Sequence, residues 1–109
     1  MGISKTPRTS VTIAATGTTF DTTVSKYEGV ITRYVFELPN YTNTVTTTLS
    51  ILDPNGVTIY SGAAHAKNAN YSIPVDVELD SSQDYTVRLT LSGAAGGAGG
   101  TAYFTFYIR

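Results

Sequence analysis

The sequence of 109 residues contains no cysteine and no tryptophan. Without cysteine the chain can form no disulfide bond, no thiol nucleophile and no thiolate metal site. Small secreted domains often depend on disulfides for their stability. We therefore expect this chain to be stabilised by the packing of its own side chains or by neighbouring subunits.

Charged residues are scarce as well. They make up 14% of the chain, and seven Lys and Arg against eight Asp and Glu leave a net charge of −1. There is no basic run, so a nucleic acid is not an expected partner, because nucleic-acid binding depends on concentrated positive charge. No apolar run is long enough for a signal peptide or a membrane span, so no membrane partner is expected either.

Few residues could carry out catalysis. His65 is the single histidine and is predicted to lie in an exposed loop, which leaves no basis for a Ser–His–acid arrangement. Asp53 and Asn55 carry oxygens that calcium could use, but the DPNG sequence is better explained as a turn. We predict no enzyme activity, no catalytic residue, no metal site and no cofactor.

Two further patterns resemble functional motifs. Asp76, Glu78 and Asp80 fall on one face of a predicted strand, where paired carboxylates could act as acid and base, but a solvated strand face explains them more simply. The run from Gly93 to Gly100 contains only Gly and Ala. It lacks the lysine and the following helix of a phosphate-binding loop.

Hydrophobic residues alternate with polar ones along most of the chain, and no stretch shows an apolar stripe at helical spacing. Strands that bury one face and expose the other are typical of antiparallel sheets stacked on a shared core. The residues predicted to face the core are Val30, Tyr34, Phe36 and Leu38; Val45, Leu49 and Ile51; Tyr71, Ile73, Val75, Val77 and Leu79; Tyr85, Val87, Leu89 and Leu91; and Ala102, Phe104, Phe106 and Ile108.

Turn residues support this interpretation. The DPNG sequence predicts a tight hairpin, and Pro74 predicts an edge or bulged strand because it cannot donate to a ladder. Tyr85, followed two residues later by Val87, resembles the tyrosine corner of immunoglobulin-like domains. The predicted fold is all-β: an antiparallel β-sandwich of about seven strands, Ig-like or a jelly-roll variant. Residues 1–9 are expected to form an extended N-terminal arm and residues 10–109 a single sandwich domain.

Two segments, the N-terminal arm and the glycine-rich run, are predicted to be flexible. The arm holds too little apolar surface to offset the entropy of ordering, so we expect it to be mobile until a neighbour binds it. The run Gly93 to Gly100 has no side chain that could anchor it. It is expected to be a flexible hairpin loop between paired strands at 85–91 and 101–108. Its glycines either serve as a spacer or permit close approach to a partner's backbone.

Four residues form the candidate partner-binding surface. Arg33, Arg88, Tyr103 and Tyr107 all fall on outward faces of predicted strands. Tyr and Arg are enriched at interface hot spots. The alternative is that outward tyrosines reflect strand propensity alone.

The stretch GVITRYVFELPNYTNTVTTTLSILDPNGVTIYSG, followed by YTVRLTLSG, resembles the small all-β virion accessory proteins of tailed bacteriophages, over about residues 29–109. Such proteins decorate or cement capsids, or lie at the head–tail junction or on the tail. The resemblance implies a non-enzymatic structural protein of the virion, made in the host cytoplasm, that binds a major capsid or tail protein as a homo-oligomer. The early strands also resemble β-sandwich modules of secreted bacterial proteases. The alternative function is a carbohydrate- or cell-surface-binding module, although tryptophan is absent.

Overall fold

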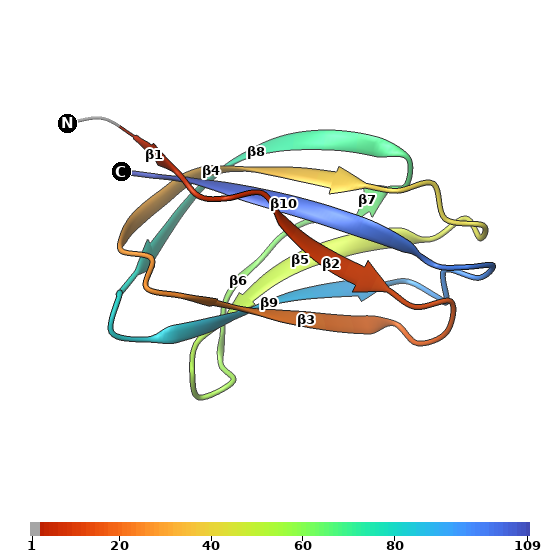
Figure 1. The fold of residues 1–109 in the computed structure, drawn as a ribbon, viewed down its shortest axis with the longest axis horizontal. Helices are drawn as coiled ribbons and strands as arrows, with labels where there is room; N and C mark the ends of the chain where they lie inside the picture. Colours follow the sequence, from red (N-terminus) through yellow and green to blue (C-terminus); the bar gives the residue numbers. More distant parts are fainter. Residues whose placement is uncertain (1–2) are drawn as a thin grey trace.

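The computed structural model describes residues 3–109, which contain ten strands and no helix (Figure 1). The additional strands relative to the predicted seven include two of only two residues each, β1 and β7. The strands are β1 Ser4–Lys5, β2 Thr9–Ile13, β3 Thr19–Ser25, β4 Gly29–Leu38, β5 Thr46–Leu52, β6 Thr58–Ser61, β7 His65–Ala66, β8 Ala69–Leu79, β9 Asp84–Leu91 and β10 Gly100–Ile108.

The strands form two antiparallel sheets that pack face to face (Figure 1). Sheet A has the order β1-β10-β4-β8, and β2 also pairs with β10. Sheet B has the order β3-β9-β5-β6, and β7 also pairs with β5. This arrangement confirms the predicted antiparallel β-sandwich. Because the part of the chain that is described has no helix, it offers none that could cross a membrane.

The core lies between the sheets and is built from the alternating apolar positions that the sequence predicts. Phe36, Phe104 and Phe106 are almost completely buried there. One prediction was wrong at the start of β4, where Ile31 is buried and Val30 is only half-buried. A shift in register between Ile31 and Arg33 breaks the two-residue period at this point, because a bulge adds one residue to the strand.

The DPNG turn and Pro74 lie where the sequence predicts them. The side chain of Asp53 accepts hydrogen bonds of 2.9 Å from the backbone N–H groups of Asn55 and Val57, and Gly56 has a φ of 82°. This turn joins β5 to β6, which pair as the predicted hairpin. The Asp53 carboxylate therefore shapes a turn. Pro74 lies in β8, the edge strand of sheet A, as its missing N–H requires.

The strands on either side of the glycine-rich run do not pair with each other, so the predicted hairpin is wrong. β9 lies between β3 and β5 in sheet B, whereas β10 lies between β4 and the N-terminal strands in sheet A. The run from Gly93 to Gly100 therefore carries the chain from one sheet to the other.

This run is also anchored, contrary to the predicted flexible loop. Ala95 is fully buried, its carbonyl accepts a hydrogen bond of 2.9 Å from the N–H of Asn43, and Gly96 donates one of 2.9 Å to the carbonyl of Ala15. A Cβ on Gly97 would overlap the hydroxyl of Thr42, and one on Gly99 would overlap the carbonyl oxygen of Ile13. The glycines thus permit close approach to backbone and side chains of the same chain.

The N-terminal segment is extended, but from Ser4 onward it belongs to sheet A. Ser4 and Lys5 pair with β10, and Thr6 is buried, with its N–H donating to the carbonyl of Phe106 at 2.9 Å. These contacts replace the mobile arm expected from composition. Met1 and Gly2 lie outside the described residues, and the domain boundary at residue 9 stays a prediction.

Candidate binding surface

Three of the four predicted surface residues lie on the outward face of sheet A. Tyr103 and Tyr107 project from β10 between buried neighbours, and Arg33 projects from β4. In the strand register Tyr103 lies opposite Glu37, and Tyr107 lies opposite Arg33. We define the tyrosine face as the surface formed by these four side chains together with Arg8.

Arg8 connects two members of the tyrosine face. Its guanidinium carbon lies 3.5 Å from the ring centroid of Tyr103. Its Nε and Nη2 atoms donate to the two carboxylate oxygens of Glu37 at 2.9 and 3.0 Å. The hydrogen bonds from Arg8 hold the pKa of Glu37 below its ordinary value. Arg8 is not among the predicted surface residues, because it falls in the segment predicted to be a mobile arm.

Arg33 forms a second stack of the same kind. Its guanidinium carbon lies 3.9 Å from the ring centroid of Tyr107. Its Nη1 atom donates to the hydroxyl of Ser72 on β8 at 2.9 Å. The stack and the hydrogen bond hold the guanidinium beside the Tyr107 ring on the outward face of the sheet.

Arg88 does not join the other three residues. It lies on β9, on the outward face of sheet B, where its Nε and Nη2 donate to the carboxylate of Asp21 at 2.9 and 3.0 Å. The two sheets and the core separate it from the tyrosine face. Arg88 therefore belongs to a different surface of the molecule.

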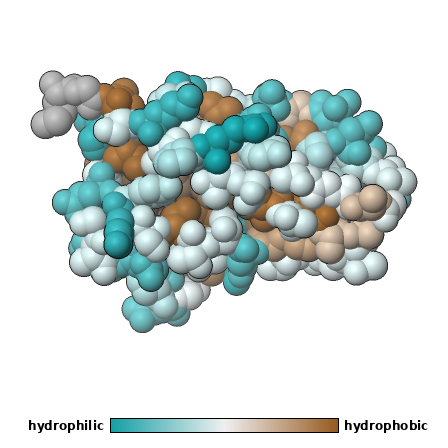
Figure 2. Space-filling view, viewed as in Figure 1, coloured by the Kyte–Doolittle hydropathy of each residue, from teal (hydrophilic) through white to brown (hydrophobic). Residues whose placement is uncertain are grey.

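A shallow hollow of about 200 Å³ adjoins the Arg8 end of the tyrosine face. Polar side chains and one aromatic ring form most of its lining, which combines hydrogen-bond donors and acceptors with an apolar surface. Its lining residues are Arg8, Glu37, Leu38, Pro39, Asn70, Thr101 and Tyr103. The view in Figure 2, taken from the side used for Figure 1, shows mostly hydrophilic and neutral residues, with hydrophobic residues in separate areas.

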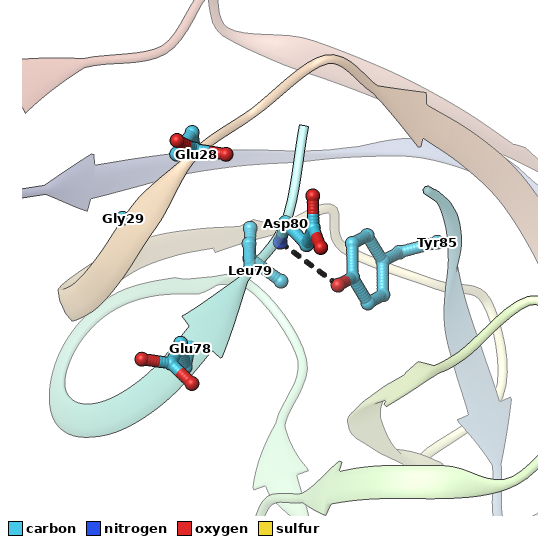
Figure 3. Close-up of a pocket in the computed structure, with 6 residues that line it drawn as sticks. All are labelled: Glu28, Gly29, Glu78, Leu79, Asp80 and Tyr85. Atoms are coloured by element: carbon cyan, nitrogen blue, oxygen red, sulfur yellow. Dashed lines mark hydrogen bonds between the residues drawn. The ribbon is translucent and has the colours of Figure 1, made fainter. Parts of the chain in front are cut away.

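A larger hollow of about 380 Å³ lies beside the β8–β9 turn, and two of its lining side chains, Glu28 and Tyr85, hydrogen-bond to that turn (Figure 3). The hydroxyl of Tyr85 accepts a hydrogen bond of 2.9 Å from the N–H of Asp80, which is the contact of a tyrosine corner. Glu28 accepts from the backbone and hydroxyl of Ser81, and these bonds lower its pKa. Between residues 3 and 109 no group of three His, Cys, Asp or Glu could hold a metal ion.

His65 lies in the short strand β7, which corrects its predicted place in a loop. It is half-buried, and its ring centroid is 4.3 Å from that of Tyr71 and 6.4 Å from that of Phe36. Among residues 3–109 its side chain makes no hydrogen bond and no ion pair with a nucleophile or a carboxylate. The ring packs as part of the sandwich.

Comparisons with known proteins support the fold. The chain matches no protein-family model and no curated protein. It is similar in structure to a family 35 carbohydrate binding module from an environmental isolate, with 15% identity, a TM-score of 0.50, and coverage of 89% of this chain and 69% of that one. At this identity the similarity shows a shared jelly-roll-like sandwich and no more.

Two other structures match with lower TM-scores. TmCBM61 in complex with β-1,4-galactotriose has 16% identity and a TM-score of 0.48, with coverage of 84% of this chain and 65% of that one. The infectious bursal disease virus VP2 subviral particle has 12% identity and a TM-score of 0.35, with coverage of 98% and 32%. Neither likeness bears on function.

Proposed function

We propose that this protein is a non-enzymatic binding module that recognises carbohydrate through the tyrosine face. One observation carries the proposal: Tyr103 and Tyr107 project from the same face of β10, and each ring is stacked with an arginine. At roughly 3.4 Å per residue the two tyrosines lie about 14 Å apart along the strand. A chain of sugar units could contact both.

The chemistry of this surface fits a sugar ligand. Sugars present apolar C–H faces and many hydroxyl groups, and aromatic rings with a few polar groups around them match both. Glu37 offers acceptors, Arg8 and Arg33 offer donors, and the tyrosine hydroxyls can do either. The hollow beside Tyr103 adds Asn70 and Thr101.

The fold is consistent with this proposal. The sandwich is shared with a family 35 carbohydrate binding module, a protein named for the carbohydrate that it binds. At 15% identity the ligand does not transfer with the fold, so carbohydrate recognition by this chain is our inference from the tyrosine face. The absence of enzyme activity is part of the same proposal, because the single histidine is engaged in aromatic packing.

A glycan array tests the proposal, followed by calorimetric titration of the strongest ligand. Wild-type protein should show saturable binding that Tyr103→Ala together with Tyr107→Ala removes. The control is Val57→Ala with Ile59→Ala, which removes exposed apolar side chains from the β5–β6 region of sheet B. If the array shows no ligand, or the tyrosine variant binds as wild type does, carbohydrate recognition by this face is rejected.

A structural role in a virion is the second candidate. Tyr and Arg on the outward face of a sheet also suit a protein interface, and Ile3, 59% exposed beside β1, is an apolar residue that a partner could cover. The predicted partners remain a major capsid or tail protein and further copies of this chain. Mass spectrometry of purified particles tests the virion location, and light scattering tests the homo-oligomer. Stoichiometric presence in particles would favour this candidate over the first.

A further inference from the structure

The two arginine–tyrosine stacks of the tyrosine face differ in charge. At the Arg8 end, both oxygens of Glu37 accept hydrogen bonds from the guanidinium, so the positive charge is balanced inside the protein. That end therefore presents polar groups without net charge to a ligand. A neutral group fits it best.

At the other end the charge is not balanced. Arg33 donates to the neutral hydroxyl of Ser72 and stacks on Tyr107, and within residues 3–109 it takes part in no ion pair. Lys5 lies opposite Tyr107 on β1, so it shares the outward face, and it is exposed. Lys5, Tyr107 and Arg33 therefore form a row across three neighbouring strands, with a cation on each side of the ring.

The neighbouring strand does not cancel this charge. The residue opposite Arg33 on β8 is Pro74, which is neutral. The carboxylates on the same face of β8, Asp76 and Glu78, lie further along the strand and form no ion pair with Arg33 or Lys5 in the described part of the chain.

From this asymmetry we infer that the row Lys5–Tyr107–Arg33 binds a carboxylate or a sulfate group carried by an acidic polysaccharide. A guanidinium presents paired donors that match the oxygens of either anion, and Ser72 and Tyr107 already hold Arg33 in place, which lowers the entropy cost of binding. This inference rests on the proposed function, because it names the class of glycan that the tyrosine face takes.

The test compares three polymers by calorimetric titration and affinity electrophoresis: polygalacturonate, dextran sulfate and uncharged dextran. Wild-type protein should prefer the charged polymers, and whether it takes the carboxylate or the sulfate identifies the anion. Arg33→Gln should weaken charged-polymer binding about tenfold, the loss expected for a charge-assisted hydrogen bond. Lys5→Gln changes an exposed side chain and should act in the same direction with little risk to folding.

Arg88→Gln is the matched control, since it removes the same charge from sheet B. Equal losses in Arg33→Gln and Arg88→Gln would mean unspecific charge attraction and would overturn the inference. Binding of dextran as strong as that of the charged polymers would overturn it while the proposed function stands. A protein that binds no polysaccharide on the array or in this titration would overturn both.

Discussion

Thr6 and Phe106 exchange two hydrogen bonds across the edge of sheet A. The Thr6 N–H donates to the Phe106 carbonyl at 2.9 Å, and the Thr6 hydroxyl accepts from the Phe106 N–H at 3.0 Å. Both residues are buried. The N-terminal segment thus pairs along one edge of β10, the strand that carries both tyrosines of the tyrosine face.

Replacing Thr6 should destabilise the protein. Thr6→Val keeps the shape but leaves the buried Phe106 N–H without its acceptor, and we expect a loss of about 1–3 kcal/mol in the free energy of unfolding. Urea denaturation measures it, with the exposed Thr12→Val as control. Equal stability of the two variants would show that the N-terminal segment is not part of the folded edge.

The glycine-rich crossover should be sensitive to added side chains. Gly56, in the β5–β6 turn, serves as the reference, because it has a φ of 82° and open space around it. Gly56→Ala should therefore lower the free energy of unfolding by about 1–2 kcal/mol, from the left-handed backbone alone. Gly99 has a φ of 72°, and the Cβ that Gly99→Ala adds would also overlap the carbonyl oxygen of Ile13. The overlap should add about 1–3 kcal/mol. Chemical denaturation of both variants measures the difference, and no difference would mean that the crossover is loosely packed.

Phe106 tests the assignment of the inward face. It is fully buried, with its ring centroid 5.0 Å from that of Phe104 and 6.4 Å from that of Tyr34. Phe106→Ala should therefore cost about 3–5 kcal/mol, because it leaves a cavity in the core. Tyr103→Ala, on the outward face, should cost less. If thermal or urea unfolding ranked the two variants in the opposite order, the faces of β10 would be reversed.

Acid should weaken the contact between Arg8 and Glu37. The hydrogen bonds from Arg8 lower the pKa of folded Glu37 below 4.5, so its contribution to stability is present above 4.5 and is lost as the pH falls through the lower, folded value. The pair is partly exposed, so the effect is small. Glu37→Gln should flatten the acid side of the stability–pH curve measured by urea denaturation. A curve identical to that of wild type would contradict this, and Glu78→Gln serves as control.

The alternation of apolar residues was enough to predict the sandwich and most of its core, because each strand buries one face. The same pattern could not show the bulge beside Ile31, which depends on how β4 meets β8 and β10. Local sequence favoured pairing of the strands flanking the crossover. The anchors of that crossover, Asn43 and Ala15, lie far away in the sequence.

The binding surface was predicted only in part for a related reason. Outward positions on strands identified Arg33, Tyr103 and Tyr107, but strand alternation does not say which sheet a residue joins. The pattern could not show that Arg88 lies on the other sheet. Arg8 was missed because composition says nothing of the pairing that places it over Tyr103.

The central claim is that ligand binds to the tyrosine face, and amide chemical-shift mapping with the strongest glycan from the array tests it most directly. The account predicts that the largest shifts fall on β4 and β10 around Arg33, Tyr103 and Tyr107, with those around Arg88 on sheet B unchanged. Shifts concentrated around Asp80 and Tyr85, or on sheet B, would contradict it.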